Sequence, residues 1–182
     1  MHPDALTSPN DNTVEDEHMR TLLDIPTEGH ISLDETVLLF ENVMQIFSNN
    51  EARERAFSDR FLTLAILGAV DKMLSLLNAA KSTYFNTNRC LSLDRKERAR
   101  PPSLVCVKST ATIGRHFLNE EESDLIAREA IKALALRLGR ETTNLKQRLF
   151  QKTGVNERGV FEMDEVEQML FRIWAFVAAV RE

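Results

Sequence analysis

Four cations stand within six consecutive residues near the middle of the chain. Residues 95–100 read Arg-Lys-Glu-Arg-Ala-Arg, so a single anion accompanies Arg95, Lys96, Arg98 and Arg100. A cluster of this kind repels itself unless negative charge lies close to it. The chemistry that it favours is therefore the binding of a phosphate-rich polyanion or of an acidic protein surface.

A second series of basic residues follows the first. We expect a helix that begins at Asn119 and carries an apolar stripe of Ala127, Ile131, Leu134 and Leu138. A step of about 100° per residue places Arg128 and Lys132 within about 40° of each other, on the side opposite this stripe. Lys108 and Arg115 precede this helix. An ordinary solvated helix face is the alternative interpretation of these cations. Arrays of Arg and Lys bind nucleic acids through phosphates, and the predicted RNA-binding residues are Arg95, Lys96, Arg98, Arg100, Lys108, Arg115, Arg128 and Lys132.

Aromatic residues that could stack on bases are few beside these cations. Tyr84 and Phe85 precede the basic cluster, and Phe117 follows Arg115. Base-specific recognition of single strands normally uses more aromatic side chains than this. The sequence therefore favours recognition of the RNA backbone or shape over recognition of base sequence.

No motif for catalysis or metal binding is present in the sequence. The four histidines are scattered over positions 2, 18, 30 and 116, and HExxH, Cys-x-x-Cys, GxSxG and Gly-rich phosphate-loop patterns are all absent. Cys90 and Cys106 are more typical of small apolar fillers than of nucleophiles. We therefore expect no enzymatic activity, no metal and no cofactor.

Acidic and basic side chains are distributed unevenly along the chain. Residues 1–60 carry 13 acidic against 4 basic side chains, residues 61–116 carry 3 against 9, and residues 117–182 carry 12 against 10.

We find no stretch of the roughly 18–20 apolar residues that a membrane span needs, and no signal peptide. Two cysteines are typical of a reducing compartment. These features predict an intracellular protein without a membrane partner.

The first 83 residues read as a tail followed by helices. Residues 1–12 are polar and are expected to be disordered. Residues 13–83 form an N-terminal helical half, in which Ser32 and Glu35 make a capping box. Its helices are expected at residues 14–23, after Ser32, and at residues 51–80. The stretch 61–70 of the last helix is apolar nearly all round, which indicates burial, and Gly68 within it indicates a close helix crossing.

A basic irregular connector, residues 84–102, separates this half from a C-terminal helical half, residues 103–182. Four helices are expected there, at residues 103–113, from an Asn119–Glu122 capping box to Gly139, at residues 142–152, and at residues 162–180. The wide apolar face of the last helix indicates a central position or a contact with another subunit. No stretch shows the alternation of apolar and polar residues that would predict a β-strand instead of a helix. The predicted fold class is all-α, a helical bundle in two halves with about six to seven helices and no sheet.

The order of residue classes in the C-terminal half carries a family resemblance. Between Leu104 and Lys152 the chain holds Val107-Lys108, Ala111, Arg115-His116-Phe117, an acidic turn at residues 120–122, an amphipathic helix ending in Leu138-Gly139, and Lys146-Gln147-Arg148. This stretch resembles the small helical RNA-silencing suppressors of closteroviruses. The resemblance implies an all-α fold, ring-shaped homo-oligomers, and sequestration of small RNAs without sequence specificity. A weaker likeness is to the helical domain of filovirus nucleocapsid-associated transcription factors, which binds a nucleoprotein.

Two hypotheses of function follow. The first is a viral suppressor of RNA silencing that acts in the host cytoplasm as a homo-oligomer. It would bind short RNA, single- or double-stranded, through the backbone. The second is a helical protein-interaction module, a nucleocapsid-associated or regulatory adaptor, that docks an acidic partner. RNA binding through phosphates should weaken steeply with salt, whereas an adaptor should be partner-specific and less sensitive to salt.

Overall fold

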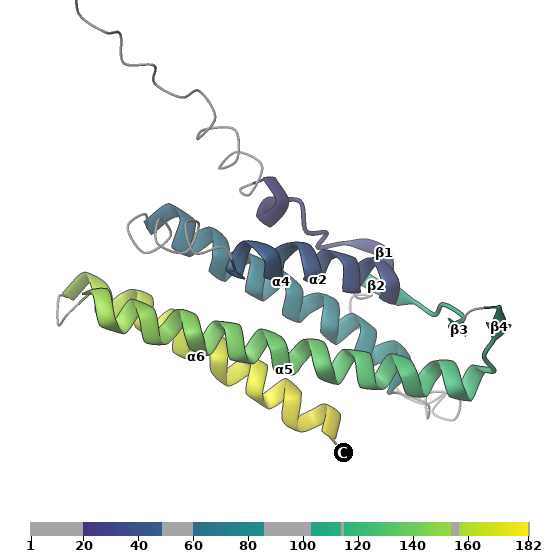
Figure 1. Ribbon diagram of the computed structural model, residues 1–182. Helices are drawn as coiled ribbons and strands as arrows, with labels where there is room; N and C mark the ends of the chain where they lie inside the picture. Colours follow the sequence, from purple (N-terminus) through teal and green to yellow (C-terminus); the bar gives the residue numbers. More distant parts are fainter. Residues whose placement is uncertain (1–19, 49–59, 86–102, 114, 154–156, 182) are drawn as a thin grey trace, which may run out of the picture.

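The computed structural model describes residues 20–48, 60–85, 103–113, 115–153 and 157–181 (Figure 1). These residues are predominantly helical, as predicted, in five helical segments. A helical turn at residues 20–23 comes first. The other elements, in chain order, are β1 (Gly29–Ser32), α2 (Leu33–Ser48), α4 (Arg60–Tyr84), β2 (Leu104–Val107), β3 (Thr112–Ile113), β4 (His116–Phe117), α5 (Glu120–Thr153) and α6 (Glu157–Arg181).

Both predicted capping boxes are confirmed. The Glu35 amide donates to Ser32 Oγ at 3.2 Å, and the Ser32 amide donates to Glu35 Oε2 at 2.7 Å. At the start of α5, the Glu122 amide donates to Asn119 Oδ1 at 2.8 Å, and the Asn119 amide donates to Glu122 Oε2 at 3.0 Å. Each pair satisfies two amides that lack partners within the helix. The hydrogen bonds to Ser32 also lower the pKa of the Glu35 carboxyl.

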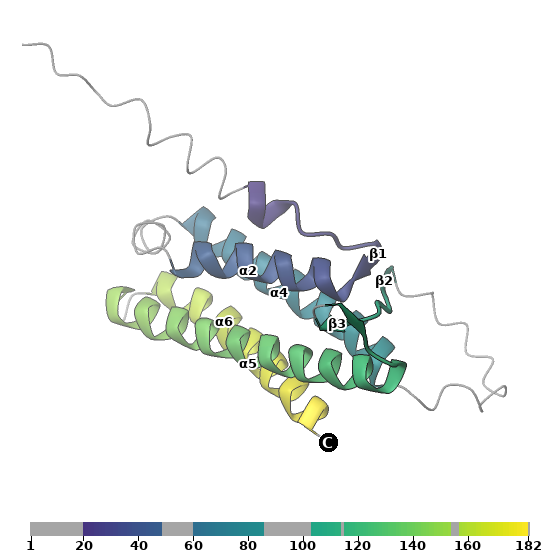
Figure 2. The ribbon, with the colours of Figure 1, turned by 45° about the vertical axis from the view of Figure 1, so that its right-hand side comes forward.

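One hydrophobic core joins helices from both sides of residues 84–102. Figures 1 and 2 show α2 and α4 lying together on one side of the molecule, with α5 and α6 on the other. Phe40 of α2, Met73 of α4, Ile131 of α5 and Ile173 of α6 are all fully buried in the same cluster. The stripe predicted for α5 is buried within it, through Ala127, Ile131, Leu134 and Leu138. The two helical halves therefore pack against each other.

Helix α4 is both long and apolar. By length and composition alone, Leu62–Tyr84 could cross a membrane, which differs from the expectation that no stretch would qualify. In the structure 56% of its apolar window is buried, and α4 packs against β2, α5 and α6. Its hydrophobicity is thus accounted for by its place in the protein core, where apolar surface is removed from water. Tyr84, which we assigned to the irregular connector, is the last residue of α4 and is buried.

The predicted absence of a sheet is wrong. Strands β1 and β2 pair in parallel, with Gly29 opposite Leu104 and Ser32 opposite Val107. The segment that we predicted as a helix over residues 103–113 holds β2 and β3 instead. Along β2, buried Leu104 and Cys106 alternate with exposed Val105 and Val107, the period of two that a half-buried strand shows. Pairing with a distant strand therefore replaces the local helix.

A β-hairpin follows β2 directly. Strands β3 and β4 are antiparallel, with Thr112 opposite Phe117 and Ile113 opposite His116. The Leu118 amide donates to the Ala111 carbonyl at 3.0 Å and closes the open end of the hairpin. We call residues 111–118 the hairpin arm; within it, residue 114 lies outside the described residues.

Two glycines play roles opposite to those that we predicted. Gly139 does not end a helix, because α5 is continuous from Glu120 to Thr153. Gly139 is instead the point where α6 comes close, since a Cβ atom there would lie 3.1 Å from Cζ2 of Trp174. A Cβ atom at Gly68 would meet nothing within 4 Å, so the predicted close crossing at Gly68 is wrong. The continuity of α5 and the strands of residues 104–113 reduce the number of described helices below the predicted six to seven.

Candidate nucleic-acid interface

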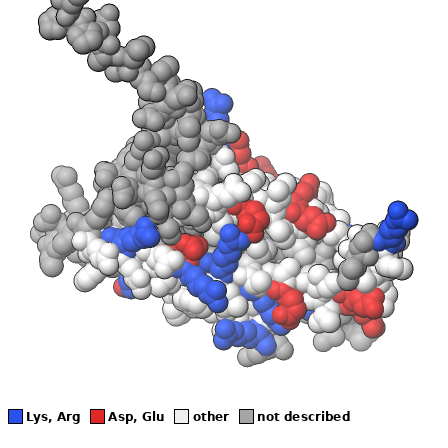
Figure 3. Space-filling view, viewed as in Figure 1, with Lys and Arg blue, Asp and Glu red and all other residues white. Residues whose placement is uncertain are grey.

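The predicted RNA-binding residues fall into two groups. Arg95, Lys96, Arg98 and Arg100 lie outside the described residues. Lys108, Arg115, Arg128 and Lys132 are described, and all four belong to the first four turns of α5 or to the segment just before it. In the face shown in Figure 3, Lys and Arg side chains are interspersed with Asp and Glu. The described cations of this view do not form one continuous basic surface.

Lys108 is held by two carboxylates. Its Nζ donates to Asp124 Oδ2 at 2.8 Å and to Glu120 Oε1 at 3.1 Å. The hydrogen bond to Asp124, and to a smaller extent the one to Glu120, raises the pKa of the Lys108 ammonium. The side chain is still 40% exposed. Exposed ion pairs are weak, at about 0–1 kcal/mol, so a phosphate can compete for Lys108.

Arg128 fastens the end of α4. Its Nε donates to the Tyr84 carbonyl at 2.7 Å, and its guanidinium carbon lies 5.6 Å from the ring centroid of Phe85. A cation at the carboxyl end of a helix satisfies a carbonyl without a helical partner and meets the negative end of the helix dipole. Arg128 therefore has a structural role at the point where residues 86–102 begin.

Lys132 forms a local ion pair within α5. Its Nζ lies 2.8 Å from Glu129 Oε1, three residues earlier, and its side chain is 31% exposed. Both Arg128 and Lys132 are half-buried, which differs from the prediction that they lie on the side opposite the apolar stripe. One of the two cations is directed to Tyr84 and the other to Glu129, so neither is a bare charge.

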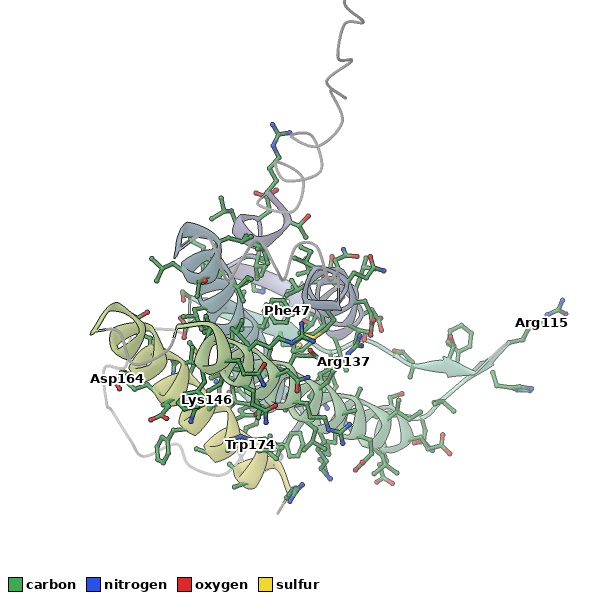
Figure 4. The ribbon with its side chains drawn as sticks, turned by 60° about the vertical axis from the view of Figure 1, so that its left-hand side comes forward. Phe47, Arg115, Arg137, Lys146, Asp164 and Trp174 are labelled. Carbon is green, nitrogen blue, oxygen red and sulfur yellow. The ribbon has the colours of Figure 1, made fainter. Side chains whose placement is uncertain are left out.

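Arg115 differs from the other three cations. It lies in the turn of the hairpin arm, is exposed, and Figure 4 shows its side chain extending away from the helices. Within the described part of the chain, no ion pair or hydrogen bond of its side chain is seen. Among the four described candidates, Arg115 is the one that presents an uncompensated charge.

A small network of polar contacts brings the two ends of segment 86–102 to the same place. The Ser109 amide donates to Tyr84 Oη at 3.2 Å, and Thr83 Oγ1 donates to the Cys106 carbonyl at 2.9 Å. Only Phe85 separates Tyr84 from the start of the segment, and Cys106 and Ser109 come soon after its end. The described residues on either side of segment 86–102 therefore lie together, at the end of the molecule that carries Lys108 and Arg128.

Other cations of α5 serve contacts between helices. Arg137 pairs with Glu41 of α2, and Lys146 pairs with Glu167 of α6. Figure 4 shows Lys146 on the side of the bundle formed by α5 and α6. These pairs join surfaces of neighbouring helices, which is the ordinary role of cations on a solvated helix face.

Four aromatic side chains are among the exposed apolar residues: Phe117 at 82% exposure, Phe171 at 77%, Phe150 at 72% and Trp174 at 42%. Phe117 was predicted to lie beside a cation, and the last helix to present a wide apolar face, whereas nothing in the sequence pattern pointed to Phe150. Most of the apolar face of α6 is nevertheless buried, through Val166, Ile173, Phe176, Val177 and Val180. The face therefore serves mainly the core, and its exposed part is the edge that holds Phe171 and Trp174.

Cys106 has the properties of a buried structural residue. It is 4% exposed and lies in the core beside Leu104. Burial raises the pKa of the Cys106 thiol to about 11, which keeps the thiol protonated at neutral pH and unreactive as a nucleophile. Among the residues that the structure describes, no group of three His, Cys, Asp or Glu side chains could hold a metal ion.

Comparison with models of known protein families, with curated proteins and with solved structures gave no match. The resemblance to closterovirus silencing suppressors stays a prediction from the sequence.

Proposed function

We propose that this chain is a non-enzymatic suppressor of RNA silencing that holds short RNA through its backbone. It would act as a viral protein in the host cytoplasm, in a homo-oligomeric form. The proposal is supported by the position of Lys108 and Arg128, which lie beside Tyr84, close to where the described chain stops before residues 86–102 and resumes after them. By sequence, residues 95–100 hold four further cations, and the exposed Arg115 follows at the outer end of the hairpin arm.

The ion pairs divide the candidate residues by their expected contribution. Arg115 supplies charge that no described carboxylate neutralises, and residues 95–100 contribute four cations by sequence. Lys108 and Lys132 must give up an ion pair with a carboxylate before they bind a phosphate, so their net contribution to RNA affinity is smaller. Arg128 already satisfies a backbone carbonyl, and its loss would act on the structure. We therefore assign most of the RNA affinity to Arg95, Lys96, Arg98, Arg100 and Arg115.

The adaptor hypothesis keeps one specific observation in its favour. Phe150, Phe171 and Trp174 expose aromatic surface on α5 and α6, and aromatic residues are enriched where proteins contact one another. A helical interaction module that docks an acidic partner through its cations would gain contact area at this edge, whereas RNA binding does not need the edge. The two hypotheses therefore predict effects of different variants.

RNA binding is tested by measuring the affinity of the full chain for short RNAs at several salt concentrations. A variant with Arg95, Lys96, Arg98 and Arg100 replaced by Ala should bind every RNA sequence more weakly by a similar factor. The slope of log affinity against log salt should flatten by roughly 0.7–0.9 for each phosphate that the variant no longer neutralises. Arg140→Ala removes an exposed cation elsewhere on α5 and is the matched control. Unchanged RNA affinity in a folded quadruple variant and in Arg115→Ala would favour the adaptor.

A further inference from the structure

The hairpin arm exposes an aromatic ring next to two side chains that can donate hydrogen bonds. Phe117 is 82% exposed, and Arg115 and His116 precede it, both exposed. Figure 4 shows the arm extending from the bundle, with Arg115 at its outer end. An apolar ring of this size loses apolar contact with water when a ligand covers it, and here the ring is next to a cation in the sequence.

The structure removes the other two aromatic residues that could stack on RNA. Tyr84 is 2% exposed, and its hydroxyl accepts the Ser109 amide. Phe85 packs against the core and faces the guanidinium of Arg128. Of the three rings beside the candidate cations, Phe117 alone is available to a ligand. A single available ring is suited to a single base.

The arm is fixed at its base rather than free to collapse onto the bundle. The Ala111 amide donates to Ser123 Oγ of α5 at 3.3 Å, and Ser123 is itself buried. Lys108 ties the preceding residues to the first turns of α5 through Glu120 and Asp124. A prepositioned arm loses less conformational entropy on binding than a flexible one.

The charges around the arm discriminate between possible ligands. Arg115 favours a phosphate at the tip, whereas Glu120, Glu121 and Glu122 stand at the base. Carboxylates repel phosphates over about 8 Å at physiological ionic strength. A base-paired duplex that reached Arg115 would bring phosphates of a second strand as well, which this acidic base disfavours. An unpaired nucleotide can instead offer a base to the ring and one phosphate to the tip.

We propose that Phe117 stacks on an unpaired base of the bound RNA while Arg115 contacts an adjacent phosphate. This inference rests on the proposed function and adds the class of RNA, which is single-stranded RNA or RNA with unpaired nucleotides at its ends. Stacking tolerates every base, because each has a π-face. The arm therefore adds affinity for unpaired nucleotides without adding sequence specificity.

The test compares Phe117→Ala with wild type on three RNAs of equal length: a single strand, the same strand with abasic positions, and a blunt duplex. Stacking on one base predicts that the variant binds the single strand about 5- to 150-fold more weakly. Affinity for the abasic strand and for the blunt duplex should change little. Phe150→Ala, which removes a similarly exposed ring of α5, is the matched control, and Phe117→Trp should keep the binding.

A direct readout of stacking is the fluorescence of 2-aminopurine placed in the single strand. Wild type and Phe117→Trp should change its emission on binding, and Phe117→Ala should not. Equal affinity of Phe117→Ala and wild type for the single strand overturns the inference, as does an equal loss on the abasic strand. If Phe117→Ala changes only the mass in light scattering, the ring contacts protein and the inference is wrong.

The two proposals can fail separately in this experiment. If wild type binds none of the three RNAs at low salt, the proposed function fails and the stacking inference with it. If wild type binds and the quadruple variant of residues 95–100 is weakened, but Phe117→Ala is not, then only the stacking inference fails.

Discussion

The first turns of α5 and the middle of α5 are joined to the rest of the molecule by different kinds of contact. Near residues 120–129, polar bonds tie the helix to the chain before it, through Lys108 with Asp124, the Ala111 amide with Ser123, and Arg128 with Tyr84. Around residues 134–149 the main contacts are apolar, through buried Leu138 and Leu149, and exposed ion pairs of Arg137 and Lys146 add to them. The comparison indicates that packing supplies stability in the middle, whereas polar bonds position the hairpin arm and the end of α4.

The largest effect is expected in the packed middle of α5. Leu138 is fully buried, and Leu138→Ala should lower the free energy of unfolding by about 2–5 kcal/mol, because it removes apolar contacts and leaves a cavity. Leu125 lies on the same helix at 61% exposure, and Leu125→Ala should change it by less than about 0.5 kcal/mol. Chemical denaturation followed by circular dichroism measures both, and similar values for the two variants would contradict the assigned burial.

A smaller effect is expected where Arg128 fastens α4. Arg128→Ala leaves the Tyr84 carbonyl without its charged donor, and hydrogen bonds to charged groups are worth about 1.5–3 kcal/mol. Arg128→Lys keeps the charge and should recover part of this stability in denaturation experiments. The structural role that we assign to Arg128 also predicts that the salt slope of RNA binding stays the same in the folded Arg128→Ala variant. A flattened slope would instead place Arg128 among the residues that bind phosphate.

The two helical glycines give the next comparison. Gly68→Ala meets open space and should stabilise the protein by about 0.5–1 kcal/mol, because Ala is the better helix former. At Gly139 the same change must displace Trp174, so the gain in helix propensity should be reduced or reversed. The thermal midpoint of unfolding measures both variants. In a Trp174→Ala background, Gly139→Ala should recover the gain, and equal gains at both glycines in the wild-type background would show that α6 does not approach closely at Gly139.

These elements also show how far the sequence alone reaches. The capping boxes at Ser32–Glu35 and Asn119–Glu122 are predictable, because a capping box is formed by neighbours in the chain. Strand β2 is not, since its partner β1 lies more than 70 residues earlier and parallel pairing leaves no local turn signal. The role of Gly139 is hidden from the sequence because the position of Trp174 depends on tertiary packing.

The sequence predicted which residues belong to the candidate site, but it did not predict the contacts that their side chains make. Clustering of Arg and Lys pointed to Lys108, Arg115, Arg128 and Lys132. Charge patterns along a chain cannot show that Lys108 turns to two carboxylates or that Arg128 turns to a carbonyl. The ring of Phe117 stands beside Arg115 in the sequence, yet its availability becomes clear only because Tyr84 and Phe85 are packed or engaged in the structure.

The smallest effect is expected for the Lys108 ion pairs at the base of the arm. Lys108→Ala should change the free energy of unfolding by about 1 kcal/mol or less, because Lys108 and Glu120 are exposed to water and only Asp124 is mostly buried. The raised pKa of Lys108 fixes the sign of the pH dependence. The folded state holds the Lys108 proton more tightly, so the contribution is present below the unfolded pKa and is lost as pH rises through the folded pKa. Wild type and Lys108→Ala should therefore differ below about pH 10 and converge in more alkaline solution. High salt should shrink the difference as well, and a difference that persists in both conditions would show that Lys108 acts through packing of its alkyl chain.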